Sequence, residues 1–149
     1  MKKTFITSAI ILILGIVLGT KIYDAKDSIT NVFSTGETYY FLQEGVYTSK
    51  EIMEENSKDL PAKAIEYKNN KYYVYLGITK EETIAKKIKS IYEEDGYQIY
   101  IKEINIANEE FSSNITQFDL LINSASSVEE ILTIEEVVLA NYEEIISNS

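Results

Sequence analysis

The stretch YYVYLGIT, residues 72–79, is a run of aromatic and β-branched residues that reaches a glycine and then a threonine. The stretch YYFLQEGVYT, residues 39–48, has the same character and also reaches a glycine before a threonine. Such runs are typical of β-strands. Each threonine begins a capping-box pattern with a glutamate three residues later, Thr48 with Glu51 and Thr79 with Glu82, which predicts that a helix follows each strand. The sequence therefore contains a strand–turn–helix unit twice.

The two predicted helices differ in the strength of their apolar pattern. The apolar positions within residues 84–92 recur at the spacing of an amphipathic helix that buries one face. Gly96 stands where a left-handed residue ends such a helix. The earlier helix has a weaker apolar stripe within residues 52–60, and Pro61 ends it.

A further strand follows each predicted helix. Residues 62–68, AKAIEYK, are a candidate edge strand, and the pair Asn69-Asn70 indicates the turn into the next strand. Residues 97–104, YQIYIKEI, form a stronger strand pattern. The order β-α-β-β-α-β predicts an α+β domain over residues 38–104. We expect a four-stranded antiparallel sheet with two helices on one face, as in ferredoxin-like and RNP-like folds.

An apolar segment precedes this domain. Residues 4–20, TFITSAIILILGIVLGT, carry no charge, with Lys2 and Lys3 before them and Lys21 after them. A helix of this length spans roughly 25 Å, and terminal lysines extend its reach towards the headgroups. A cleaved signal peptide is the main alternative, but no A-x-A site follows the segment.

We therefore predict an N-terminal transmembrane helix over residues 1–21 and a polar tether over residues 22–37. Lysines are nearly balanced on the two sides of the apolar segment, so the positive-inside rule gives only a slight preference. The free N-terminus tips that preference towards a cytoplasmic N-terminus. The expected localisation is a cell membrane crossed once, with the domain extracytoplasmic.

Several residue types that carry chemistry are absent, since the chain has no Cys, His, Trp or Arg. Their absence excludes the usual zinc sites, the Cys-His and Ser-His-Asp nucleophile pairs and a bidentate clamp for phosphate. We expect no metal and no cofactor. The acid pairs Glu81-Glu82 and Glu93-Glu94 lie on charged helix surfaces without a pocket, so we do not expect an enzyme.

The net charge of −10 is unevenly placed. Residues 38–104 are close to neutral, whereas residues 105–149 contain nine acidic residues and no lysine. Nucleic acid is not an expected partner, because affinity for phosphate comes mainly from lysine and arginine.

Residues 105–149 are predicted to form an acidic helical extension. Apolar residues recur at helical spacing within residues 115–122 and again after Ser127, which forms a third capping box with Glu130. Three destinations are open for the apolar faces: the domain itself, a second copy of the chain, or a protein partner bound through residues 107–149. If these helices pack on the free face of the sheet, they cover it.

The first and third predicted strands each contain a short motif that includes a glycine. In the first strand, Leu42 and Gln43 are followed by Gly45 and then by the aromatic Tyr47. In the third strand, an aromatic residue and a short apolar run lead to Gly77. This order and spacing, over about residues 38–104, resemble the SPOR (sporulation-related repeat) domain family. That family usually has an arginine where this chain has Tyr73, and Pro-Phe where it has Ile78-Thr79.

The resemblance implies a ligand and an arrangement. SPOR domains bind peptidoglycan and favour glycan strands stripped of stem peptides, such as those at division septa and in sporulation. A membrane anchor followed by a tether and this domain is common in the family. The expected function is therefore that of a bacterial cell-wall protein that binds glycan strands in cell division or sporulation.

The predicted topology leaves one sheet face free of the two helices. Alternation assigns Leu42, Val74 and Leu76 to the core. Glycan-binding residues are then predicted on the free face: Phe41, Gln43, Tyr73, Tyr75 and Tyr100. Aromatic rings pack on the apolar faces of pyranose rings, and tyrosine adds a polar tip, while an amide bonds hydroxyl and N-acetyl groups. The family motif gives Gln43 by identity and Tyr73 and Tyr75 by position.

One alternative function stays open. The domain could be a degenerate interaction scaffold of the same fold that binds a protein partner at the membrane. Exposure of the sheet face separates the two, because only an accessible face can bind glycan.

Overall fold

The computed structural model describes residues 36–149, so the predicted transmembrane helix and most of the tether lie outside the described residues. The elements follow in the order β1 (Glu37–Tyr47), α2 (Lys50–Ser57), β2 (Ala64–Lys68), β3 (Lys71–Thr79), α3 (Glu82–Glu94), β4 (Tyr100–Ile106), α4 (Glu109–Ser124) and α5 (Val128–Ser147). Within residues 36–149, no helix is both long and apolar enough to cross a membrane.

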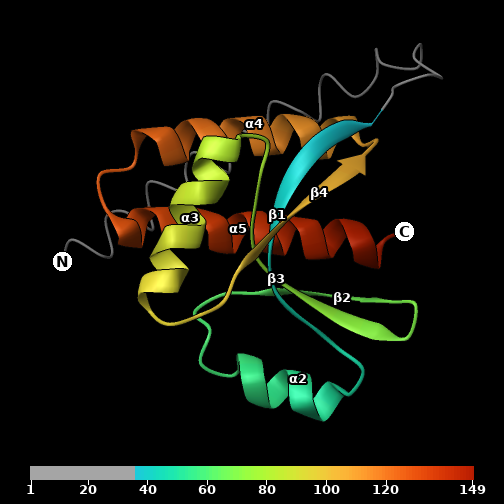
Figure 1. The fold of residues 1–149 in the computed structure, drawn as a ribbon. Coiled ribbons are helices and arrows are strands. Elements are labelled where there is room, and N and C mark those ends of the chain that lie inside the picture. The colour runs from blue at the N-terminus through green and yellow to red at the C-terminus, as the bar shows by residue number, and fades with distance from the viewer. Residues whose placement is uncertain (1–35) are drawn as a thin grey trace.

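The strands form one antiparallel sheet with the order β2-β3-β1-β4 (Figure 1). This confirms the predicted α+β class and the four-stranded antiparallel sheet. The arrangement is consistent with a ferredoxin-like fold. The β2–β3 turn consists of Asn69 and Asn70 with φ of 53° and 59°, which matches a two-residue hairpin turn and confirms the predicted role of this pair.

The starts of α2 and α3 differ from the predicted capping boxes. Ser49, not Thr48, is the N-cap of α2, and its hydroxyl accepts a bond from the Ile52 N–H at 3.4 Å. Thr79 remains in β3 opposite Tyr40, so α3 begins only at Glu82 without a side-chain cap. The predicted cap at Ser127 is confirmed, because its hydroxyl accepts a bond from the Glu130 N–H at 3.2 Å.

The register of the strands divides the side chains between two faces. Leu42 lies opposite Gly77 of β3 and Ile101 of β4, on what we call the Leu42 face. The other side, the Phe41 face, carries Phe41 and Gln43 of β1, with Gln43 opposite Tyr75 and Tyr100. Leu42, Val74 and Leu76 are fully buried, as predicted.

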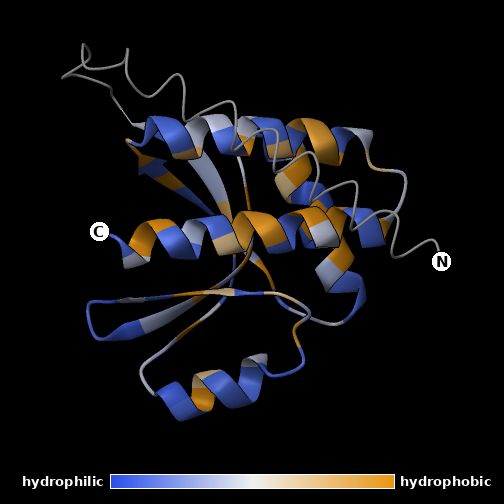
Figure 2. Cartoon of the chain, turned by 180° about the vertical axis from the view of Figure 1, so that it is seen from behind, coloured by the Kyte–Doolittle hydropathy of each residue, from blue (hydrophilic) through white to orange (hydrophobic). Residues whose placement is uncertain are grey.

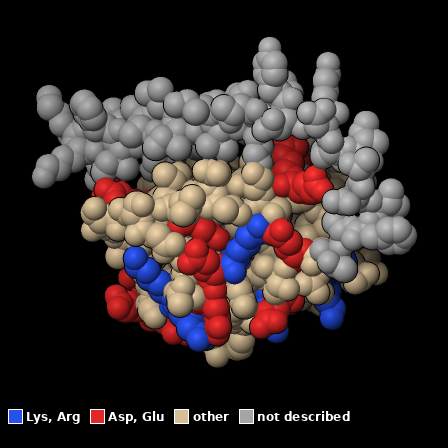
Figure 3. Space-filling view, turned by 90° about the horizontal axis from the view of Figure 1, so that it is seen from above, with Lys and Arg blue, Asp and Glu red and all other residues tan. Residues whose placement is uncertain are grey.

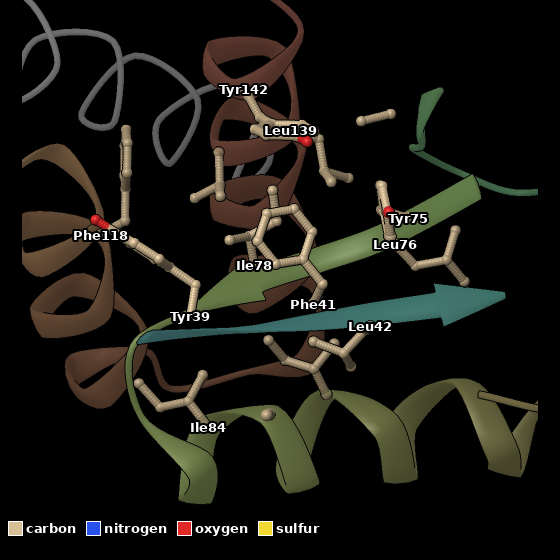
Figure 4. Packing of buried hydrophobic residues seen from close by; sticks show 14 of the residues in the cluster. Tyr39, Phe41, Leu42, Tyr75, Leu76, Ile78, Ile84, Phe118, Leu139 and Tyr142 are labelled. Atoms are coloured by element: carbon tan, nitrogen blue, oxygen red, sulfur yellow. The ribbon is translucent and has the colours of Figure 1, made fainter. Parts of the chain in front are cut away.

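Helices cover both faces of the sheet. In Figure 4 the α3 helix and Ile84 lie on one side of β1 and β3, and α5 with Tyr142 lies on the other. Seen from behind, α4 and α5 lie side by side across the sheet, and both carry hydrophobic and polar residues (Figure 2). The acidic extension therefore packs on the domain itself, which is the first of the three possibilities. It covers part of the sheet face that was expected to be open.

An aromatic cluster fills the space between the Phe41 face and the extension. The Phe41 ring meets the rings of Tyr75 and Tyr142 edge to face, with centroid distances of 4.9 and 5.1 Å. The Tyr39 ring packs on Phe111 of α4 at 5.1 Å. Such tilted and edge-to-face pairs contribute beyond their buried area, so the extension is an integral layer of this core.

Buried carboxyl groups also connect the extension to the strands. Beyond Tyr75, β3 has no β2 residue beside it, and the free Ile78 N–H donates to Glu135 of α5 at 3.0 Å. Asp119 of α4 accepts bonds from the Thr79 hydroxyl at 2.6 Å and from the Lys80 N–H at 2.9 Å. The extension thus satisfies backbone groups that the sheet leaves unpaired.

Candidate functional site

A groove remains on the Phe41 face where α5 does not cover the sheet. Its volume is about 720 Å³. The end of α5 lines one side, and strands β1 to β4, Asn69 of the β2–β3 turn and Phe111 of α4 also contribute. The side chains that matter below are contributed by all four strands and by α5: Gln43, Glu66, Lys68, Tyr73, Tyr75, Lys102 and Tyr142.

Gln43 is the residue of this groove whose hydrogen bonding stands out. The residue as a whole is only 9% exposed, and within residues 36–149 its amide has no hydrogen-bond partner. The amide is not among the fully buried unpaired side-chain atoms, and Gln43 lines the groove. A polar group that no protein group satisfies pairs with water or with a ligand. Two shifts in the β1–β3 register flank Gln43, one on each side, and such irregularities re-aim side chains next to binding sites. The amide is therefore available to a molecule in the groove.

Tyr73 and Tyr75 give the groove its aromatic surface. Their rings are nearly parallel, with 14° between the planes and 6.4 Å between the centroids. Tyr75 is almost fully buried against Phe41, while Tyr73 is partly exposed. Tyr73 therefore offers the more accessible ring face for contact with a ligand.

Glu66 of β2 connects the sheet to α5 at the edge of the groove. Its Oε2 accepts bonds from the Tyr75 hydroxyl at 3.3 Å and from the Tyr142 hydroxyl at 3.2 Å. Burial, followed by the charge of Glu66, raises the pKa of both tyrosines, so both hydroxyls stay protonated and act as donors. This arrangement fixes the orientation of the Glu66 carboxylate.

Two of the five predicted binding residues do not lie in the groove. Phe41 is fully buried because Tyr142 of α5 covers it, so the prediction that its ring meets a ligand is corrected. Tyr100 is 46% exposed at the β4 edge but does not line the groove; the Lys102 ammonium lies 5.9 Å from its ring centroid. The structure brings together Gln43, Tyr73 and Tyr75.

Charge around the groove is mixed in sign. Lys68 and Lys102 line it together with Glu66 and Glu103. Lysine and acidic side chains also lie side by side on the described surface in Figure 3. A mixed surface of this kind suits a neutral or zwitterionic ligand better than a polyanion.

The most perturbed acids lie in the core rather than in the groove. Burial raises the pKa of Glu135 well above its usual value, with the Asp119 charge adding to the effect and the Ile78 N–H opposing it. Burial likewise raises the pKa of Asp119 to about 6, against the bonds from Thr79 and Lys80. Neither carboxyl lines the groove, so their perturbed pKa values reflect docking of the extension. Within residues 36–149 no group of three or more acidic side chains could hold a metal ion.

Sequence reasoning missed Glu66 and Tyr142 as members of the site. A signal for Glu66 was present, because a two-residue turn at Asn69-Asn70 places Glu66 directly opposite Tyr73. No comparable signal marked Tyr142, since its helical spacing shows an apolar face but not the surface on which that face packs.

Comparisons with protein-family models, with curated proteins and with solved structures find no match for this chain.

Proposed function

We propose that this chain is a membrane-anchored, extracytoplasmic protein that binds the glycan strands of peptidoglycan in cell division or sporulation, and that the groove on the Phe41 face is its binding site. The anchor is the apolar segment at residues 4–20, and the SPOR resemblance supplies the ligand class. One observation carries the proposal: Gln43 is only 9% exposed, lines the groove, and has no hydrogen-bond partner for its amide among residues 36–149.

The chemistry of the groove suits a saccharide. The accessible Tyr73 ring can stack on the apolar face of a pyranose, and the Gln43 amide can both donate to and accept from an N-acetyl group.

The experiment is co-sedimentation of the detergent-solubilised full-length chain with isolated peptidoglycan sacculi. Wild type is expected to pellet with the sacculi. Tyr73→Ala is expected to weaken binding by about three- to tenfold, the range for loss of one aromatic contact. Tyr67→Ala is the matched control, since Tyr67 is a 60% exposed strand tyrosine outside the groove.

Two results would count against the proposal. If wild type stays in the supernatant, glycan binding is refuted. If Tyr67→Ala weakens binding as much as Tyr73→Ala, the groove is not the site.

An interaction scaffold is the second candidate, and the burial of Phe41 favours it. The Tyr142 ring already occupies the part of the sheet where a ligand would meet Phe41. A chain that keeps its fold but fails to bind sacculi would support this alternative, with the extension or the remaining groove as the surface for a protein partner or a second copy.

A further inference from the structure

The Glu66 carboxylate in the groove is oriented by hydrogen bonds from both the sheet and the extension. Glu66 stands on β2, and its Oε2 is held by the Tyr75 hydroxyl of β3 and the Tyr142 hydroxyl of α5. Among the described residues, no donor reaches the other oxygen, Oε1. An ionised carboxylate accepts bonds at both oxygens, so Oε1 keeps its full accepting capacity.

We infer that Glu66 accepts a hydrogen bond from a hydroxyl of the ligand bound in the groove. We also infer that Tyr142 is a positioning residue through which α5 completes the binding site. This inference rests on the proposed function. The ligand it implies is a saccharide that presents at least one free hydroxyl to Glu66 while its ring stacks on Tyr73. Glu66 lies opposite Tyr73 in the β2–β3 register, so one sugar residue can meet both groups.

The acidic extension thereby has a second role besides closing the core. It removes Phe41 from solvent, and it supplies Tyr142, Ile145 and Ile146 as a wall of the groove. The domain over residues 38–104 would, without α5, lack one of the two bonds that orient Glu66. The site is therefore composite, and the extension is part of it.

Hydrogen bonds to a charged acceptor are about twice as strong as those between neutral groups. Glu66→Gln keeps the shape of the side chain but removes the charge, and we expect about a tenfold loss of affinity for sacculi. Tyr142→Phe keeps the ring that packs on Phe41 and removes only the hydroxyl, and we expect a loss of about threefold.

The test measures binding of the full-length chain to sacculi for wild type, the two single variants and the double variant. If Tyr142 acts through Glu66, the Tyr142→Phe change has no further effect in the Glu66→Gln background, because the oriented charge is already gone. A purely structural role of the Tyr142 hydroxyl would give additive losses. Glu54→Gln, an exposed glutamate on α2, is the matched control. Thermal unfolding of each variant by circular dichroism checks that the fold is kept.

The outcomes separate this inference from the proposed function. A loss of sacculus binding in Glu66→Gln, with no further loss in the double variant, supports the inference. Binding of Glu66→Gln equal to wild type overturns the role of Glu66 while glycan binding itself stands. Additive losses overturn the positioning role of Tyr142. Failure of wild type to bind refutes the proposed function, and the inference falls with it.

Discussion

Because the extension packs on the sheet, we expect the free energy of unfolding to depend on pH through one buried carboxyl group. Asp119 is buried on α4, and its pKa is raised from 3.8 to about 6, chiefly by burial. At 1.36 kcal/mol for each pKa unit, this corresponds to about 3 kcal/mol of preference for the protonated form in the folded state. The unfolded chain loses the proton near pH 4, before the folded chain does. Stability from this group is therefore complete below about pH 4 and is lost as the pH rises through about 6.

The test variant is Asp119→Asn, which keeps an oxygen to accept the Lys80 N–H but does not titrate. Urea unfolding of the full-length chain in mild detergent, followed by tyrosine fluorescence and circular dichroism, gives the free energy of unfolding at several pH values. The wild-type value minus the variant value is expected to fall by about 3 kcal/mol between pH 4 and pH 7. Acids distant from Asp119 are common to both chains and cancel in this difference. Glu135 is the exception, because the Asp119 charge contributes to its raised pKa, and we expect that pKa to be less raised in Asp119→Asn.

Glu144→Gln is the control, because Glu144 is exposed on the same extension. Its difference from wild type should change little with pH. If the curves for wild type and Asp119→Asn run parallel from pH 4 to pH 7, the carboxyl is not buried in the folded protein, and the described docking of α4 is wrong.

Two further predictions concern packing and backbone geometry. Phe41→Ala removes a fully buried ring that meets Tyr75 and Tyr142, and should lower the free energy of unfolding by about 3–5 kcal/mol, as measured by urea unfolding; a loss below about 1 kcal/mol would indicate an exposed ring. Gly96→Ala places a side chain at φ of +89° and should cost about 1 kcal/mol or more in the same assay, whereas no loss would mean that the turn after α3 differs from the one described.

The local features of the fold were accessible from sequence because each depends on a few neighbouring residues. The hairpin at Asn69-Asn70, the left-handed Gly96 and the cap at Ser127 all follow from side chains close in the chain. The start of α3 was misplaced because the pairing of Thr79 with Tyr40, a contact distant in sequence, keeps Thr79 in the strand.

The surface on which the extension packs could not be predicted from the apolar periodicity of its helices. A helical stripe shows which face is buried but not what covers it. One signal was nevertheless present. Glu135 falls between Ile131 and Val138 on the buried stripe of α5, and Asp119 lies on the corresponding stripe of α4. A carboxyl group at a core position lowers stability unless hydrogen-bond donors surround it. These acids therefore indicate that the helices pack against unpaired backbone N–H groups.

Gln43 lies at the boundary of the sheet surface that α5 covers. Where α5 covers the sheet, the Phe41 face is apolar, with Phe41 and Ile78 fully buried. Gln43 lies two residues further along β1, between two register shifts, and there the covering by α5 gives way to the groove. A position whose only requirement was packing would favour an apolar side chain, because an amide that loses contact with water without gaining a partner costs stability. A glutamine at this boundary is accounted for when a ligand or water meets its amide in the groove. The proposed glycan ligand would also contact the neighbouring Tyr73 ring and Glu66 carboxylate.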